Sequence, residues 1–430
     1  MSIQQNFPAI TPSLSLNFAR SKTLDPRITF SRTTTATRVN EQGLVEVVSA
    51  DIPRFDHEYE NGVIKSLGLL VEESRSNLVT YSSDMSQWTD NGSPIYADND
   101  TTAPDGTLTA DKLTENNAAA NGRWIEVTIS ANTTYTVASF IKPTDQPRTR
   151  IGVYSNVGSW YGNVDTDWDA NGEPTTQNSV GASNIKYEPY PNGWYRVSFQ
   201  FTSPSTINGT IEYFHMPDRI ASGKSAWFWG AQLEAGAFPT SYIPTSGSTA
   251  TRNPDTVTMT GDNFSDWYNQ EQGSIVWIGR VYTKEEPSLS AFRINRTDGG
   301  NLRGMAMQID TRYSNNNNNT INFMSRTQSS NIPSKVASVG IVTSTSTIKL
   351  AGGYIESVGL STIRAAFNGD PENSYAGASQ TDVVDGAMNE LEIMGERGTS
   401  GTNNYFTGVC EQLVYYPRIL TDAQLQNLTK

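Results

Sequence analysis

Cysteine, histidine and clustered basic residues are almost absent from this chain of 430 residues. The single cysteine, Cys410, cannot form an intrachain disulfide, and its surroundings, FTGVCEQLVYY, predict a small core residue and not a nucleophile. The two histidines, His57 and His215, lie far apart in the chain, which argues against histidine-dependent triads and histidine-rich metal sites. The net charge of −13, from 31 Lys and Arg against 44 Asp and Glu, argues against nucleic acid or an anionic membrane as the main partner.

Long apolar runs are missing as well. No stretch approaches the roughly 20 residues of a membrane span, and the start of the chain, MSIQQNFPAITPSLSLNF, has no basic segment followed by an apolar core. We therefore expect neither membrane insertion nor a cleaved signal. Charged residues make up only 17% of the chain, beside 34 Gly and 20 Pro, so the chain is polar and rich in turns. Its length predicts two or three domains.

What is present is an alternation of strand-like segments and turns. Segments such as RWIEVTI, TYTVASFIK, GWYRVSFQF and TIEYFHM are separated by Asn-Gly pairs, which favour type I′ hairpin turns. The pattern predicts an all-β chain built from antiparallel sandwiches. We expect a strand-rich N-terminal region at 1–80, a jelly roll at 81–245, a linker at 246–260 and a further sandwich at 261–430, with the five asparagines at 315–319 in a loop.

Three parts of the chain resemble known families. The stretches WGAQLEAG (229–236), TSYIPT (240–245) and NGWYRVSFQFTSP (192–204) resemble a carbohydrate-binding-module-like jelly roll that occurs in many bacteriophage virion proteins. LDPRITFSRTTTATRVNEQGLVE, PRFDHEY and GLLVEESRSNLVTYS are similar to the region that precedes this jelly roll in phage fibre and decoration proteins. The ending GVCEQLVYYPRILTDAQLQNLTK resembles the last strand and helix of laminin-G or concanavalin A-like domains, with Thr421 and Gln424 forming a helix capping box.

The resemblance implies a structural protein of a phage virion, either a tail fibre or a head fibre or capsid decoration protein. Such a protein would assemble in the host cytoplasm as a homo-oligomer, with a homotrimer as our first expectation. It would contact other virion proteins through its N-terminus and host-surface polysaccharide without catalysis. Two alternatives stay open: a capsid cement protein that binds no glycan, and a polysaccharide depolymerase.

Arginines recur among the apolar segments of the N-terminal region, at Arg27, Arg32, Arg38, Arg54 and Arg75. A guanidinium can bind a carboxylate in a bidentate fashion or hold backbone carbonyls. We interpret these arginines as structural clamps for carboxylates such as those of Asp56, Glu72 and Glu73.

The candidate glycan-binding residues are aromatic. Trp160, Tyr161 and Trp168 lie among Gly, Asn, Ser and Asp, where few apolar neighbours could bury them. Exposed aromatic rings offer flat faces to sugar rings, and nearby amides and carboxylates bind the hydroxyls. The alternative is that these rings pack against a neighbouring subunit or between domains.

The carboxylates give weaker signals. Glu390, Glu392 and Glu396 depart from the Glu-x-Asp-x-Glu pattern of concanavalin-like glucanases, so no catalytic residue is assigned and the chain is not expected to be an enzyme. Asp165, Asp167 and Asp169 alternate as the oxygen ligands of calcium can, but the glycine and the distal glutamate of an EF-hand loop are out of place. No cofactor is expected, and a structural calcium ion is left open beside a plain hairpin with a solvated acidic face.

Overall fold

The fold of this chain was obtained as a computed structural model. It describes the residues in the following ranges: 7–116, 121–155, 158–207, 209–220, 222–282, 289–295, 304–310, 320–326, 335–341, 347–357, 360–369, 377–379, 388–395 and 407–430. The asparagines at 315–319 and Glu396 lie outside these ranges. No helix in the described ranges has the length and hydropathy needed to cross a membrane.

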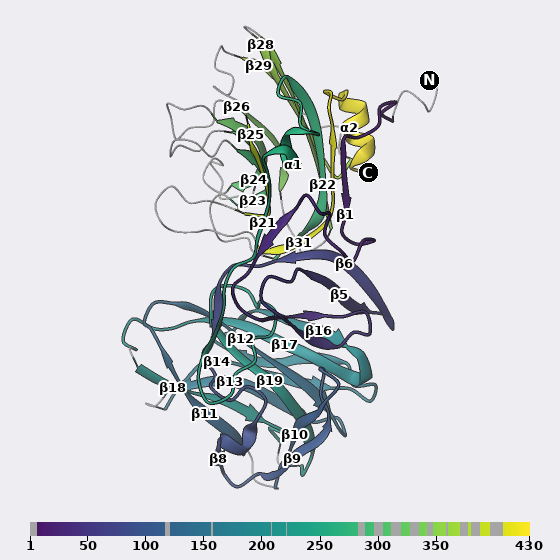
Figure 1. The fold of residues 1–430 in the computed structure, drawn as a ribbon. Helices are drawn as coiled ribbons and strands as arrows, with labels where there is room; N and C mark the ends of the chain where they lie inside the picture. The colour runs from purple at the N-terminus through teal and green to yellow at the C-terminus, as the bar shows by residue number, and fades with distance from the viewer. Residues whose placement is uncertain are drawn as a thin grey trace.

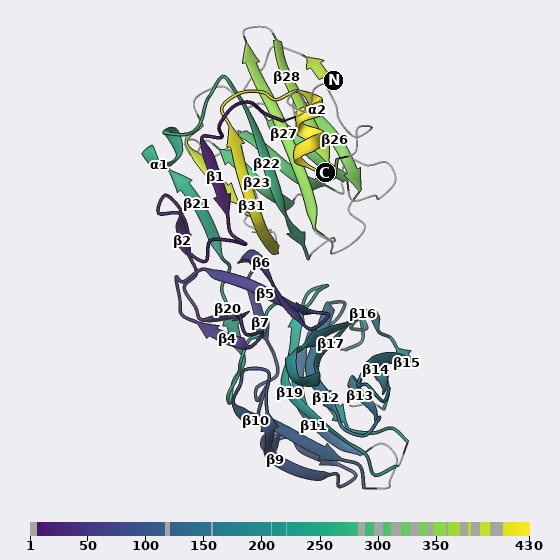
Figure 2. The ribbon, with the colours of Figure 1, turned by 90° about the vertical axis from the view of Figure 1, so that its right-hand side faces the viewer.

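The described chain is almost entirely β-structure and forms two lobes (Figure 1). The first described residues and the C-terminal helix α2 (Asp422–Leu428) lie together in one lobe, where Ile10 packs beside Leu425 and Leu428. Strands from the first part of the chain lie between the lobes (Figure 2). The prediction of an all-β fold with antiparallel sandwiches is confirmed.

The middle of the chain folds as a jelly-roll sandwich of two antiparallel sheets. The first sheet has the order β16 (Ser183–Tyr190), β17 (Trp194–Thr202), β12 (Thr134–Pro143), β19 (Ser225–Ala235), β10 (Leu108–Thr114) and β9 (Ile95–Thr102). The second sheet has the order β15 (Pro174–Val180), β14 (Trp160–Trp168), β13 (Arg148–Ser155), β18 (Gly209–Met216), β11 (Gly122–Ile129) and β8 (Thr89–Asn91). Alternate residues of both sheets point inward, where Val137, Val164 and Phe199 are fully buried.

The second lobe is a larger sandwich, also of two antiparallel sheets. One sheet has the order β29 (Gly377–Ser379), β28 (Leu360–Phe367), β27 (Ile348–Ser357), β22 (Gln272–Val281), β31 (Gly408–Tyr416), β6 (Val63–Val71) and β5 (Arg54–Glu60), with β1 (Leu14–Asn17) also paired to β31. The other has the order β2 (Thr29–Ser31), β21 (Thr256–Thr260), β30 (Glu390–Ile393), β23 (Leu289–Asn295), β24 (Gly304–Asp310), β25 (Thr320–Arg326) and β26 (Lys335–Ile341).

The N-terminal region is therefore not a separate unit. Strands β1, β2, β5 and β6 complete the two sheets of the C-terminal sandwich, and Leu16, Phe55 and Leu69 lie in the same core as Trp277 and Tyr415. Each lone strand leaves a row of backbone groups and an apolar face unsatisfied, and the C-terminal strands supply both partners. The boundary expected near residue 80 is a boundary in the sequence and not in the fold, because strands before it share sheets with strands of the C-terminal sandwich.

The expected linker at 246–260 is also structured. Within it, β20 (Ala250–Arg252) pairs with β7 (Arg75–Asn77), and β21 pairs with β2 and β30. A further hairpin, β3 (Ala36–Val39) and β4 (Val45–Val48), covers the jelly roll, where Val45 packs with Trp194 and Trp229.

The predicted Asn-Gly hairpin turn is confirmed at Asn192-Gly193, where the backbone needs two residues with positive φ. Asn192 and Gly193 have φ angles of 64° and 78° in the turn η3 (Pro191–Gly193) between β16 and β17, as a type I′ turn requires. By contrast, Asn121-Gly122 is not a hairpin tip, because Gly122 opens β11 and a Cβ there would lie 2.2 Å from the carbonyl oxygen of His215. The remaining short helices are η2 (Met85–Gln87) and α1 (Asp262–Ser265).

The end of the chain follows its predicted form. Strand β31 is followed by helix α2, which begins with Thr421 as N-cap, and the capping box between Thr421 and Gln424 is present. Cys410 is fully buried in the C-terminal core, and burial raises the pKa of its thiol above the usual range. It is a core residue, as expected.

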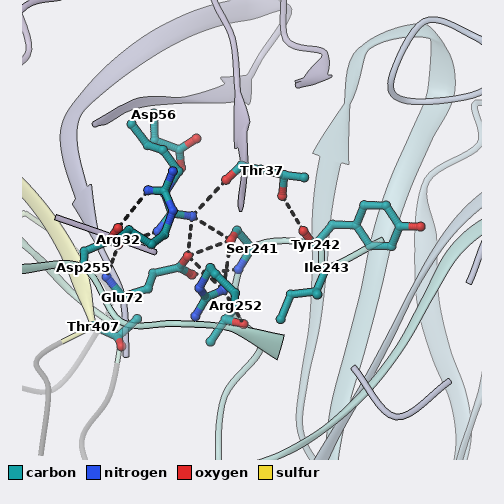
Figure 3. A network of polar contacts seen from close by, with 12 residues as sticks. Arg32, Thr37, Asp56, Glu72, Ser241, Tyr242, Ile243, Arg252, Asp255 and Thr407 are labelled. Atoms are coloured by element: carbon teal, nitrogen blue, oxygen red, sulfur yellow. Dashed lines mark hydrogen bonds and ion pairs between the residues drawn. The ribbon is translucent and has the colours of Figure 1, made fainter. Parts of the chain in front are cut away.

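A buried network of ion pairs joins the N-terminal strands to the end of the jelly roll (Figure 3). Arg54 donates from Nη1 to Glu72 Oε2 at 2.6 Å and from Nη2 to Asp255 Oδ2 at 2.5 Å. Arg32 binds the other oxygen of Asp255 at 2.9 Å, and Arg252 lies 3.0 Å from Glu72 Oε2. The side chains in these pairs are at most 2% exposed, so the charges are compensated by each other and not by water.

The clamps expected from the arginine pattern are largely present. Arg54 binds Glu72, and Arg75 contacts Glu73. No arginine among the described residues binds Asp56, whose Oδ1 accepts the backbone N–H of Val39 at 2.7 Å.

We expect Glu72→Gln to lower the free energy of unfolding at pH 7 by about 3–5 kcal/mol, since it leaves Arg54 and Arg252 buried without their shared anion. Burial raises the pKa of Glu72, but the charges of Arg252 and Arg54 outweigh burial and lower this pKa to about 2. The carboxylate therefore stabilises the fold above its unfolded pKa of 4.5 and loses this effect as the pH falls towards 2. Guanidinium unfolding at several pH values measures both.

The matched control is Glu60→Gln, which removes the exposed partner of Lys65 and should leave the unfolding midpoint unchanged. If the two variants lost equal stability, or if the deficit of Glu72→Gln did not shrink between pH 4.5 and pH 2, the buried network would not carry the stability assigned to it.

Candidate functional site

The three aromatic residues predicted to bind sugar do not form one platform. Trp168 is only 3% exposed and belongs to the jelly-roll core, where its Nε1 donates to Thr149 Oγ1 at 2.8 Å. Tyr161 is half-buried and packs against the same core. Trp160 alone lies on the outer face of the second sheet. The expectation that Trp168 is exposed is wrong, because even-numbered residues of β14 from Gly162 onward point inward.

A β-bulge explains why the side chains of Trp160 and Tyr161 lie in different surroundings. Strands β13 and β14 pair without a break until Val153 meets Gly162, but the next pair joins Tyr154 to Trp160. The extra residue, Tyr161, interrupts the alternation of the strand. Trp160 thereby turns to the outer face with Tyr154, while Tyr161 stays against the core.

The acidic residues considered for calcium are already occupied. Asp165 is 5% exposed and forms a two-point ion pair with Arg150 of the neighbouring strand. Asp167 forms a similar pair with Arg148, at 2.6 and 3.0 Å. Asp169 accepts the backbone N–H groups of two residues in the β14–β15 turn. The three carboxylates thus serve the hairpin and do not converge on one point, so the calcium arrangement considered for them is not formed.

Another acidic group has better proximity. Carboxylate oxygens of Asp84, Asp98 and Asp111 lie within 4.8 Å of one another. Both oxygens of the buried Asp111 accept backbone N–H groups, from Met85 at 2.8 Å and Asn99 at 2.9 Å. Burial raises the pKa of Asp111 to about 6. This cluster is therefore accounted for by the turns that it holds together.

The carboxylates considered for catalysis lie on the other lobe. Glu390 and Glu392 point to one side of β30 while Leu391 and Ile393 enter the core. In register, Glu392 stands opposite Arg293 and Thr258, and Glu390 stands opposite Asn295 and Thr260. The solvated-face interpretation of this strand is compatible with that arrangement.

A group of four aromatic side chains lies on the outer surface of the second jelly-roll sheet. We call Trp124, Phe214, Trp160 and Tyr154 the aromatic face. Ring centroids are 6.2 Å apart for Trp124 and Phe214, 5.5 Å for Phe214 and Trp160, 5.0 Å for Trp160 and Tyr154, and 6.1 Å for Tyr154 and Phe214. The rings come from four adjacent strands, β11, β18, β13 and β14, so Phe214, Trp160 and Tyr154 form a triangle and Trp124 lies beside it. Three of the four rings are only partly buried.

One glycine allows this arrangement. Gly152 of β13 lies beneath the aromatic face. A Cβ at that position would come within 2.7 Å of both Trp160 Cζ3 and Asn163 Cβ. The missing side chain lets the indole of Trp160 lie close to the sheet. The guanidinium of Arg150 lies 4.8 Å from the centre of the same indole.

Polar side chains without hydrogen-bond partners among the described residues lie under and beside the aromatic face. Asn163 is fully buried, yet neither its Nδ2 nor its Oδ1 has a hydrogen-bond partner among the described residues. Glu126 and Glu212 stand directly opposite each other on β11 and β18. Burial, together with the charge of Glu126, raises the pKa of Glu212. Unpaired buried amides and facing carboxylates are both unfavourable in a fold without a ligand.

Sequence reasoning missed Trp124, Tyr154 and Phe214, and also Asn163. The signal was present in two segments, because RWIEVTI and TIEYFHM place Trp124 and Glu126, and Glu212 and Phe214, at alternate positions opposite their apolar residues. Which alternate set faces outward depends on strand pairing.

Comparison with solved structures finds carbohydrate-binding modules, the class of domain to which residues 81–245 bear a sequence resemblance. One is the Ruminococcus gnavus IT-sialidase CBM40 bound to α2,3-sialyllactose, which is 18% identical over 38% of this chain and 84% of that chain, with a TM-score of 0.29. A CBM4 structure is 12% identical over 37% of this chain and 94% of that chain, with a TM-score of 0.23.

A third similar structure is the Clostridium thermocellum xylanase 10B fragment of CBM22-1 and GH10 modules with xylohexaose. It is 14% identical over 40% of this chain and 30% of that chain, with a TM-score of 0.25. All three scores lie below 0.5, so the ligands of these proteins carry no argument for this chain. No family model and no curated protein matches the chain.

We expect Asn163→Leu to raise the free energy of unfolding by about 1–3 kcal/mol, because it removes a buried amide that has no partner. Thermal and guanidinium unfolding of the full chain measure the change. The matched control is Asn77→Leu: Asn77 is equally buried, but it donates to the carbonyls of Ala231 and Ile243 and accepts from Val79 and Leu233. This control should lose about 3 kcal/mol or more. Destabilisation by both variants would mean that Asn163 is satisfied in the folded protein.

Proposed function

We propose that this chain binds glycans without catalysis through the aromatic face of its jelly roll. The observation that carries the proposal is the contiguous group of four rings, Trp124, Phe214, Trp160 and Tyr154, with the facing carboxylates of Glu126 and Glu212 beside it. Sugar rings have apolar C–H faces that pack on aromatic rings, while their hydroxyls need donors and acceptors nearby. The aromatic face offers the apolar surface, and the carboxylates of Glu126 and Glu212 offer the polar partners.

The shape of the site favours a ligand with more than one sugar ring. Phe214, Trp160 and Tyr154 form a triangle, with centroids 5.0 to 6.1 Å apart, and Trp124 extends it on one side. A glycan lying across this aromatic face would contact several rings at once. Weak contacts of this kind gain strength through repeated presentation on an oligomer.

We further propose that the chain is a fibre or decoration protein of a phage particle. The support is the resemblance of WGAQLEAG, TSYIPT and NGWYRVSFQFTSP to the jelly roll of such proteins. The partners would then be copies of this chain, other virion proteins and a host-surface polysaccharide. A homotrimer would have three times the chain mass of 47.1 kDa by light scattering, and a monomeric mass at assembly concentrations would contradict it.

Such a protein would attach to the virion through its N-terminus, but deletion of residues 1–80 cannot test this attachment. Removing those residues would take β1, β2, β5 and β6 out of the sheets of the C-terminal sandwich. A failure to enter the virion would then report unfolding.

We expect Trp160→Ala and Trp124→Ala each to weaken binding to host-surface polysaccharide by about fivefold or more, because each removes a ring that contributes of order 1–3 kcal/mol of contact. Binding is measured by surface plasmon resonance on immobilised polysaccharide. The control is Trp227→Ala, because Trp227 is a half-buried tryptophan on the outer surface of the other sheet, bonded to Asp100.

Equal weakening by Trp227→Ala, or unchanged binding by both aromatic-face variants, would place the glycan elsewhere. The same samples test the enzymatic alternative, because Glu126 and Glu212 are a facing carboxylate pair beside the rings. We expect no release of reducing ends by the wild type. Release that Glu212→Gln abolishes would instead make the chain a hydrolase.

A further inference from the structure

A concave site lies on the opposite side of the jelly roll from the aromatic face. It is a cleft of about 520 Å³ between the outer surface of the first jelly-roll sheet and the strands β5, β6 and β22 of the other lobe. Figure 1 shows β16 beside β5 at this junction, where the two strands are in contact. Volumes of about 300–1,000 Å³ are typical of sites for small molecules.

One wall comes from strand β16. Lys186, Glu188 and Tyr190 alternate along it and point away from the jelly-roll core, whereas Ile185 and Tyr187 pack inward. The ring of Tyr190 is fixed by an edge contact with Phe140, at a centroid distance of 4.9 Å. The wall therefore presents an ammonium group, a carboxylate and a phenol at regular spacing.

The other wall is held rigidly. Arg280 of β22 donates to both oxygens of Glu58 on β5, at 2.6 and 2.8 Å, so these two charges neutralise each other. Asp56 is fixed by its bond from Val39, and Tyr282 follows directly after β22. Burial raises the pKa of Asp56 to about 7, so near neutral pH its carboxyl group can donate as well as accept.

Several polar groups of the cleft have no protein partner among the described residues. These are the hydroxyls of Tyr190 and Tyr282 and the ammonium group of Lys186. Burial raises the pKa of both phenols, which keeps them neutral and able both to donate and to accept a hydrogen bond. Groups of this kind, left unpaired in a concave site, are those that a ligand satisfies.

We propose that this cleft binds a neutral, hydroxyl-rich molecule of the size of a mono- or disaccharide, independently of the aromatic face. The charges that line it are balanced, with Glu58 paired to Arg280 and Glu188 standing opposite Arg196 in register. A strongly anionic ligand would need a surplus of cations, and Lys186 is the one cation of β16 in this wall. Hydroxyl groups match the phenols, the ammonium group and the carboxyl group together.

The test uses the double variant Tyr190→Phe with Tyr282→Phe, which removes two hydroxyls and keeps both rings. The probes are lactose, maltose and cellobiose, measured on the full chain by saturation-transfer NMR and calorimetry. We expect at least one of them to bind the wild type in the millimolar range and to bind the double variant at least about tenfold more weakly. Lys186→Met should weaken the same probe.

Two controls separate this cleft from the aromatic face. Tyr187→Phe removes a hydroxyl from the same strand, but that hydroxyl is hydrogen-bonded to Thr166 and Thr176 of the second jelly-roll sheet, so binding should persist. Trp160→Ala should also leave disaccharide binding at the cleft unchanged.

If Trp160→Ala abolished all binding while the double variant bound normally, the cleft proposal would fall and the aromatic face would stand. Binding of none of the three probes to the wild type would overturn the cleft proposal as well. Melting temperatures of all variants, compared with that of the wild type, show whether a loss of binding is a loss of fold.

Discussion

Buried charge is the constraint on which the rest of this structure depends. Arg54, Glu72 and Asp255 are removed from water, and an isolated charge in that position would cost several kcal/mol. They are tolerated because each has an opposite charge at hydrogen-bond distance. The partners come from the N-terminal strands and from the segment that leaves the jelly roll. The network can therefore form only when these distant segments meet, and it specifies how they meet.

The contacts around this network decide which outer surface of the jelly roll is covered and which stays open. Ser241, near the end of the jelly roll, donates its backbone N–H to Glu72, and the hydroxyl of Thr37 donates to the carbonyl of Tyr242. The hairpin of β3 and β4 and the strand β5 are thereby held against the first sheet. The cleft is formed on that side, whereas the outer surface of the second sheet stays uncovered and displays the aromatic face.

Small departures from regular structure give each site its chemistry. The bulge at Tyr161 turns Trp160 outward, and Gly152 leaves room for its indole. At the cleft, the turn at Asn192 and Gly193 joins β16, which is in contact with β5, to β17. The side chains of the two candidate sites are thus positioned by local exceptions to the strand pattern, and such exceptions are not visible in the alternation of the sequence.

The sequence by itself determined the all-β class, the presence of a jelly roll, the structural role of the arginines and the capped C-terminal helix. These features depend on alternation, turn residues and local hydrogen bonds, which short stretches of chain specify. Only the tertiary structure decided that residues 1–80 belong to the C-terminal sandwich, that Trp168 is buried, and that Trp124 and Phe214 stand beside Trp160. The physical reason is that strand pairing and register are long-range choices, and a shift of one residue moves every side chain to the other face of its sheet.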